Sequence, residues 1–280
     1  MLGINRLEYY RAQQRSQSKK DLSKEVIELV QSVRVQMPRI GTRKLYHILA
    51  EQLKSMKVGR DKLFTILRAN GMLIKPKKSY HITTDSHHRF RKHKNKIDQL
   101  SINRPEQVWV SDITYVGTRT NPMYLALITD AYSKKIMGYD VSSSLNAQGA
   151  IRALKMAIKN RQYPAKSLIH HSDRGLQYCC NEYQQLLDHK AIECSMTESY
   201  DPYANAVAER INGILKQEFI GSHKNQTLEL MKKIVNQSID IYNDKRPHWS
   251  CRMLTPNLMH LQQDVKILSY KKNTGLEVCP

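Results

Sequence analysis

The stretch VWVSDITYVG at residues 108–117 has the composition of a β-strand, because β-branched and aromatic side chains dominate it. Two more strand-like segments follow after short links, at residues 123–132 and 134–142. Three consecutive strands with such short connections predict an antiparallel meander. Asp112 interrupts the first strand, since aspartate is disfavoured within strands. Three interpretations of Asp112 are open: a functional carboxylate, one partner of a buried ion pair with an arginine, or a residue on the solvent-exposed face of an edge strand.

Helical and strand-like segments alternate after this meander. Periodic apolar positions and strand composition predict, in order, a helix at 145–160, a strand at 167–173, a helix at 182–190, a strand at 191–196 and a helix at 204–219. Three strands followed by alternating helices and strands predict an α/β domain with a mixed sheet. This is the element order of the ribonuclease H-like fold, a mixed five-stranded sheet with flanking helices.

Two further acids stand out in this order of elements. Asp173 ends the strand SLIHHSD, and Glu209 lies on the helix at 204–219. Each also has an ordinary interpretation, because strand-end aspartates often cap turns and helical glutamates usually face solvent. We expect the helix to pack with Glu209 beside its inward side. That side carries Val207, Ile211, Ile214 and Leu215.

Taken together, the three acids predict a metal site. Carboxylates from the first strand, from the end of the fourth strand and from a later helix can converge at one edge of such a sheet. Three carboxylates repel one another unless cations separate them, and Mg²⁺ prefers hard oxygen ligands. Two ions could then support an in-line phosphoryl displacement, with Asp112 on the central strand bridging both ions.

The first 74 residues are predicted to be helical. Apolar positions at helical spacing predict helices at 20–36, 42–53 and 60–69, with breaks at Pro38 and at Asn70–Gly71. The last two helices, joined by a short turn, fit a helix-turn-helix, a pattern that many three-helix bundles share. The candidate DNA contacts of this pair are Arg43, Lys44, Arg60 and Lys62.

Positive charge is concentrated in the first third of the chain. The net charge of +20 divides into 24 Lys/Arg against 8 Asp/Glu in residues 1–105, and 21 against 17 in residues 106–280. A basic linker is expected at 75–104, and its first part is either a solvated charge run or a polyanion-binding arm. Nucleic acid is the leading polyanion. The linker adds three candidate DNA contacts: Lys75, Lys77 and Lys78.

Other features narrow the class of protein. The five cysteines include no Cys-x-x-Cys pair, so reduced thiols are expected and a zinc site is not. The chain has no apolar stretch of about 20 residues, and its N-terminus has no apolar core for a secretory signal. These features predict a cytoplasmic protein with no membrane partner.

Three segments carry a resemblance to a known family: WVSDITYV, HSDRGLQY and NAVAERINGILKQE. Each contains one of the acids, and the 35 residues between Asp173 and Glu209 are the family's usual gap. YNDKRPHWSCRMLTP resembles the family's closing block, and LGINRLEYYR and PRIGTRKLYHIL resemble its opening and its helix-turn-helix. The chain thus resembles the DDE transposases of the insertion-sequence-three type, as their second-frame product, with a retroviral-integrase-like catalytic core.

The resemblance implies cleavage of DNA at the ends of an insertion sequence, followed by transfer of the new 3′ hydroxyl to another phosphodiester. It makes Asp112, Asp173 and Glu209 the catalytic residues and the ligands of two Mg²⁺ (or Mn²⁺) ions when DNA is bound. It makes Lys216 a contact to the transposon end.

The same resemblance divides the rest of the chain. The catalytic core is expected at 105–222, and a C-terminal helix and tail at 223–280. Within that last part a helix is expected at about 227–243, and the remainder is expected to be mostly irregular. Asp130 and Asp140 also end strands, but they match no acidic block and we interpret them as structural.

The expected partners are DNA, as transposon ends and target, a second copy of the chain on DNA, and an upstream-frame product that is separate or fused. The resemblance places the protein with the bacterial nucleoid. Ser199–Tyr200 replace the family's commoner glycine-containing stretch, so the loop before Glu209 should differ. The competing interpretations are a catalytically inactive or domesticated DNA-binding relative, and a nuclease of the same fold that only hydrolyses.

Overall fold

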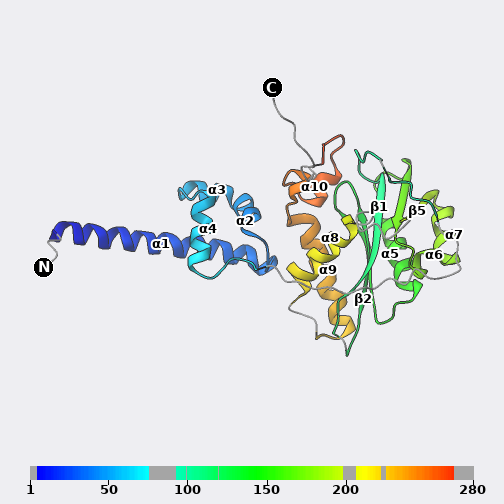
Figure 1. Cartoon of the computed structure of the whole chain (residues 1–280), viewed down its shortest axis with the longest axis horizontal. Coiled ribbons are helices and arrows are strands. Elements are labelled where there is room, and N and C mark those ends of the chain that lie inside the picture. The colour runs from blue at the N-terminus through cyan, green and yellow to red at the C-terminus, as the bar shows by residue number, and fades with distance from the viewer. Residues whose placement is uncertain are drawn as a thin grey trace, which may run out of the picture. The chain divides into compact units, whose positions relative to one another are not determined.

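A computed structural model of the chain describes residues 5–75, 93–98, 100–118, 120–197, 206–221 and 225–267. The chain forms two compact units, Met1–Lys78 and Ser79–Pro280, and each is described by itself (Figure 1). The loop change at Ser199–Tyr200 and the candidate contacts Lys77 and Lys78 lie outside the described residues. Within the described ranges, no helix combines the length and the apolar character that a membrane crossing requires.

The first unit is all-helical, as the sequence predicts. Its helices are α1 (Arg6–Gln36), α2 (Thr42–Ile48), α3 (Ala50–Ser55) and α4 (Arg60–Ala69). Fully buried aliphatic side chains in its core include Val26, Val30, Leu45, Leu53, Leu63 and Leu67. The helix predicted at 20–36 is too short, because residues 6–19 lack an apolar stripe yet consist largely of good helix formers. The helix predicted at 42–53 is interrupted at Leu49, where the backbone leaves helical geometry.

The second unit contains a five-stranded sheet in the order β3-β2-β1-β4-β5. The strands are β1 (Val108–Tyr115), β2 (Tyr124–Asp130), β3 (Ile136–Ser142), β4 (Leu168–Ser172) and β5 (Ile192–Met196). The first three strands pair antiparallel, which confirms the predicted meander, whereas β1 with β4 and β4 with β5 pair parallel. This mixed sheet confirms the ribonuclease H-like fold, and β1 is its central strand.

Helices cover both faces of the sheet (Figure 1). The covering helices are α5 (Ala147–Lys159), α6 (Leu176–Cys179) and α7 (Asn181–His189) on one face and α8 (Ala206–Ile214) and α9 (Leu228–Lys245) on the other. Trp109 is buried in the core under the first three helices. Ala208 of α8 joins Val108 and Val110 in a second apolar cluster. Because side chains alternate across a strand, the even-numbered residues of β1 face α8.

The helix predicted at 204–219 changes its geometry partway along. At Leu215, α8 passes into a π-helix, η1 (Leu215–Ile220), a rare form that often marks functional sites. α9 (Leu228–Lys245) follows. The buried Arg246 holds both carboxylate oxygens of Glu218, at 2.6 and 2.8 Å. This ion pair ties the π-helix to the end of α9.

Two short helices follow α9 within the described residues. They are the 3₁₀ helix η2 (Trp249–Cys251) and α10 (Pro256–His260). Thr255 caps α10, and Pro256 occupies a first-turn position that needs no backbone donor. Both helices are too short to show a periodic apolar pattern, which is why the sequence did not predict them, while the other described residues of this segment are irregular, as expected.

Buried polar contacts join α10 to the sheet. The fully buried His260 lies between the buried carboxylates of Glu106 and Asp130. Burial acts to lower the pKa of His260, but hydrogen bonds with Asp130 and Glu106 raise it overall. Asp130 also accepts the backbone N–H of Glu106 at 2.7 Å, and Asp140 forms a two-bond ion pair with Arg152 at 2.8 Å. These contacts give Asp130 and Asp140 partners within the fold, which supports their interpretation as structural residues.

Gly138 on β3 lies too close to α5 for a side chain to fit. A Cβ atom there would lie 2.6 Å from the backbone nitrogen of Ala157 and closer still to the carbonyl oxygen of Ala153. We therefore expect Gly138→Ala to lower the free energy of unfolding by about 1–3 kcal/mol, because the backbone must move. Urea unfolding followed by circular dichroism measures this change.

Gly213→Ala is the matched control for that substitution. Apart from the chain neighbours and the backbone of its own helix, no atom of the described residues lies within 4 Å of a Cβ at Gly213, and alanine favours the helical conformation. The control should leave the free energy of unfolding unchanged or raise it. Equal losses in the two variants would contradict the tight contact between β3 and α5.

Candidate active site

Asp112 lies in the middle of the central strand β1, and its side chain is half-buried. Neutral N–H groups hold both of its oxygens. The backbone N–H of Ile113 donates to Oδ1 at 2.9 Å, and the side-chain amide of Asn212 donates to Oδ2 at 2.7 Å. Because β1 lies between β2 and β4, Asp112 is not on an edge strand. These two hydrogen-bonding partners are neutral, so neither is the arginine of a buried ion pair.

Asp173 directly follows β4 and accepts the backbone N–H of Gly175 at 3.0 Å. It therefore caps a turn, as its ordinary interpretation proposed, but its position has a second consequence. The parallel register of β1 and β4 pairs Ser111 with Ser172. Because Asp112 and Asp173 are each the next residue, the register brings both acids to the same end of this strand pair.

Glu209 lies in the first turn of α8 with its side chain exposed. The side of the helix that packs inward differs from the expected one. The buried residues are Ala208, Ile211, Asn212 and Leu215, while Val207 and Ile214 are only partly buried. This rotation places Glu209 on the exposed side of the helix instead of beside the core.

The three acids nevertheless act on one another. The pKa of Asp112 rises from 3.8 to about 7, first through burial and then through the charge of Asp173, with a smaller contribution from Glu209. Hydrogen bonds from Asn212 and Ile113 oppose this rise. Across the described residues, no group of three His, Cys, Asp or Glu side chains is gathered closely enough to hold a metal ion. The acids share one neighbourhood without forming a closed ligand shell.

A divalent cation fits this set of donors. Carboxylate oxygens are the ligands that Mg²⁺ prefers, and a bound cation would remove the repulsion that raises the pKa of Asp112. Two buried polar atoms of this region also have no hydrogen-bond partner among the described residues: the Tyr178 hydroxyl and Asn212 Oδ1. Burial, and then the charges of Asp173 and Asp112, raise the pKa of Tyr178 well above its ordinary value, so its hydroxyl remains a donor.

Sequence reasoning missed Tyr178 and Asn212. Both lie inside the acidic blocks, five residues after Asp173 and three residues after Glu209. The helical spacing of Asn212 relative to Glu209 was a usable signal, because such residues are neighbours on a helix surface. No comparable signal marked Tyr178, since a tyrosine near a strand end usually belongs to the core.

Lys216 lies on the same side of its helix as Asn212. Ala208, Asn212 and Lys216 follow one another at four-residue intervals along α8 and η1. The Lys216 ammonium donates to the Thr114 hydroxyl at 3.1 Å. Thr114 is two residues after Asp112 and therefore on the same face of β1. One helix side thus places both Asn212 and the candidate DNA contact against the strand that carries Asp112.

Five other candidate DNA contacts are described in the first unit. They are Arg43, Lys44, Arg60, Lys62 and Lys75, of which only Lys44 is half-buried and the others are exposed. Arg60 contacts Asp61 at 3.0 Å in an exposed ion pair, which leaves its stem accessible and adds little stability. Exposed basic side chains on a small helical unit are available to phosphates.

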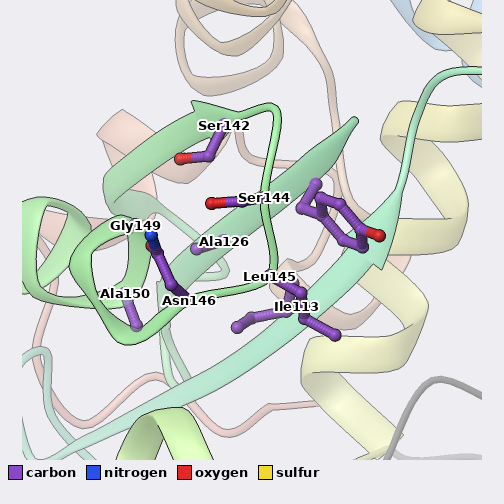
Figure 2. A pocket seen from close by; sticks show the side chains of 9 residues that line it. Ile113, Ala126, Ser142, Ser144, Leu145, Asn146, Gly149 and Ala150 are labelled. Atoms are coloured by element: carbon purple, nitrogen blue, oxygen red, sulfur yellow. The ribbon is translucent and has the colours of Figure 1, made fainter. Parts of the chain in front are cut away.

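A small notch near β1 does not belong to the acidic site (Figure 2). It has a volume of about 190 Å³ including open solvent, and Ile113, Ser142 and Ser144 are among its lining residues. Ile113 and Asp112 are consecutive, so their side chains point to opposite faces of the sheet. The notch therefore lies on the α5 side, whereas Asp112 faces α8.

Comparison with known proteins gives matches over most of the chain. One model of the integrase core domain matches residues 102–202, and a second matches residues 190–256. The chain is 32% identical to the "uncharacterized 31 kDa protein" of insertion element IS600 from Shigella sonnei, covering 91% of this chain and 94% of the relative. It is 33% identical to the transposase InsF for insertion sequence IS3A of Escherichia coli K12, covering 68% of this chain and 66% of the relative.

Two solved structures are similar as well. A chain of the simian T-cell lymphotropic virus intasome in complex with the PP2A regulatory subunit B56 gamma has a TM-score of 0.50 and 18% identity, covering 84% of this chain and 80% of that chain. That likeness shows the fold. The HTLV-2 integrase catalytic core domain, in complex with magnesium, has a TM-score of 0.45 and 19% identity, covering 56% of this chain and 97% of that chain.

The raised pKa of Asp112 predicts a pH-dependent stability in the absence of divalent cations. Because the folded pKa of about 7 exceeds the ordinary 3.8, the proton on Asp112 stabilises the fold fully below pH 3.8, and this contribution is lost as the pH rises through 7. Asp112→Asn keeps the shape without the charge. At pH 8 it should raise the free energy of unfolding by roughly 1–3 kcal/mol, and at pH 5 by much less.

Urea unfolding of both proteins at pH 5 and pH 8, with a chelator present, measures this difference. Added Mg²⁺ should stabilise the wild-type chain at pH 8 and leave Asp112→Asn unchanged, since binding to the folded state stabilises it. A difference between the two proteins that is the same at both pH values would show that the Asp112 carboxyl is not under this electrostatic stress.

Proposed function

Because the chain belongs to the integrase-core transposases of the IS3 type, we propose that its second unit cleaves the ends of an insertion sequence and joins them to target DNA. The position of Asp112 is the observation that carries this proposal. A carboxylate in the middle of the central strand, held by neutral donors and repelled by two more acids, is costly unless cations bind there.

The ligands of the ions are Asp112, Asp173 and Glu209. These three residues would hold two Mg²⁺ or Mn²⁺ ions, which would supply activation of the nucleophile and stabilisation of the leaving oxygen in an in-line displacement. The chain's own contribution is to hold the carboxylates: the N–H groups of Ile113 and Asn212 orient Asp112, and that of Gly175 orients Asp173. The same arrangement serves attack by water and attack by a 3′ hydroxyl, without a covalent enzyme intermediate.

DNA contact is divided between the two units in this proposal. Lys216, whose ammonium already lies at Thr114 near the acids, binds a phosphate of the transposon end. The first unit supplies further phosphate contacts from Arg43, Arg60 and Lys62, because an ammonium or guanidinium group exposed on a helix can reach the DNA backbone. Recognition of the ends then depends on more than the acidic site.

The active assembly in this proposal is a homo-oligomer on DNA that works with an upstream-frame product. One chain contributes one set of the three acids. Joining both ends of an element to a target requires two such sets close together. The upstream-frame product, separate or fused, supplies recognition of the terminal sequence.

Removal of any one acid should strongly lower the rate of strand transfer. Asp112→Asn, Asp173→Asn and Glu209→Gln are each expected to lower the rate about 10²–10⁴-fold, because several kcal/mol of charge stabilisation is lost. The assay uses the chain fused to its upstream-frame product, Mg²⁺ or Mn²⁺, and labelled DNA with the cognate ends. Joined strands are resolved on a denaturing gel.

Asp188→Asn is the control, because Asp188 is an exposed acid on α7 and should be replaceable without loss. Wild-type joining by all three acid variants would overturn the assignment of the site. DNA binding by the wild-type chain without cleavage or joining would support the inactive DNA-binding relative. Cleavage that is never followed by joining would support the nuclease.

DNA binding should weaken steeply as the salt concentration rises. Each phosphate contact contributes a slope of about −0.9 to the logarithm of affinity against the logarithm of salt. The double variant Arg60→Ala/Lys62→Ala should therefore reduce the magnitude of the slope by about 2. Fluorescence anisotropy with a labelled duplex measures it, with Lys155→Ala on α5 as the exposed control. An affinity that does not change with salt would contradict the proposal that basic side chains of the first unit bind DNA phosphates.

A further inference from the structure

We propose that Asn212 is a positioning residue of the acidic site, which fixes the Asp112 carboxylate with its amide N–H and offers its amide oxygen to the hydrated divalent ion. This inference rests on the proposed function. It adds to the three acids a fourth, neutral side chain, on the side of α8 that faces Asp112. Its contribution to metal binding can be tested separately from that of the acids.

The packing of α8 against the sheet fixes the position of Asn212. It is 4% exposed, on the side of α8 that lies against β1. Its neighbours four residues away on either side are Ala208, which packs with Val108 and Val110, and Lys216, which reaches Thr114. The asparagine thus lies over Asp112 between an apolar contact and a polar one.

The orientation of the amide follows from its partner. A charged carboxylate only accepts hydrogen bonds, so the amide nitrogen must face Asp112, as the 2.7 Å distance to Oδ2 shows. Within a carboxamide the oxygen lies about 2.3 Å from the nitrogen, so Asn212 Oδ1 lies within about 5 Å of Asp112 Oδ2. This is the distance over which a hydrated ion bound to Asp112 would reach it.

The amide oxygen itself lacks a partner. Asn212 Oδ1 is buried and accepts no hydrogen bond from any described residue. A buried acceptor without a donor costs free energy, and a donor bound at this oxygen would remove that cost. Beside three acids, a hydrated divalent cation is the donor that both the oxygen and the neighbouring charges favour.

The same amide limits the movement of Asp112. With Ile113 N–H on Oδ1 and Asn212 on Oδ2, the carboxylate plane is held by one bond at each oxygen. Without Asn212, the bond from Ile113 is the one that remains among the bonds of Asp112 within the described residues, and the side chain could rotate away from the ion. Partners that orient metal ligands typically contribute about 10–100-fold in metal affinity.

Mn²⁺ binding to the full chain tests this role without relying on activity. Electron paramagnetic resonance of free Mn²⁺ gives the dissociation constant. We expect Asn212→Leu, which has nearly the same size, to raise this constant about 10–100-fold, and Asn212→Ser, which keeps a small donor, to raise it less. In the strand-transfer assay, Asn212→Leu should raise the half-saturating metal concentration more than it lowers the rate at saturating metal.

Asn243→Leu is the matched control. Asn243 is also a buried amide on a helix, and it bonds both the N–H and the carbonyl of Ile136 at 3.0 Å, in α9 and away from the acids. Its loss should lower the melting temperature while the Mn²⁺ dissociation constant stays within about twofold of wild type. A purely structural asparagine at 212 would behave in the same way.

The outcomes separate this inference from the proposed function. If Asp112→Asn weakens Mn²⁺ binding while Asn212→Leu and Asn212→Ser bind as the wild type does, the role of Asn212 is wrong and the acidic site stands. If Asp112→Asn also binds as the wild type does, the acidic site is wrong. A wild-type chain that binds no Mn²⁺ at millimolar concentration, even with DNA carrying the cognate ends present, overturns both.

Discussion

The candidate active site depends on one constraint, which is a carboxylate in the middle of the central strand of a buried sheet. Asp112 occupies that position, and burial together with the charges of Asp173 and Glu209 raises its pKa to about 7. A chain selected for stability alone would place a β-branched residue there. The neutral donors that hold Asp112 reduce this cost, and a divalent cation would remove the remaining repulsion.

The helices around this strand have separate tasks. α5, α6 and α7 bury the other face of the sheet, so β1 cannot shift without disturbing a large apolar core. α8 and η1 place Asn212 beside Asp112 and Lys216 beside Thr114 of β1. The bidentate contact between Arg246 and Glu218 secures η1 from the α9 side. Rigid elements thus surround the acids, as precise chemistry requires.

Local signals in the sequence were sufficient for some elements and not for others. α4 matched its prediction at 60–69, because an apolar periodicity ends at the Asn70–Gly71 signal. α1 was predicted too short, since a helix without an apolar stripe shows no periodicity. The π-helix at Leu215–Ile220 has the same apolar spacing as an α-helix over so few residues, and only packing against α9 and β1 reveals it.

By itself, the sequence determined the order of the strands and of the longer helices, the excess of positive charge in residues 1–105 and the family through its acidic blocks. These are properties of neighbouring residues or of spacing along the chain. Only the tertiary structure decided that the β1–β4 register brings Asp112 and Asp173 to one end, that α8 is rotated to expose Glu209, and that Asn212 meets Asp112. The physical reason is that these relations join residues up to 100 positions apart, and register and helix rotation depend on how whole elements pack.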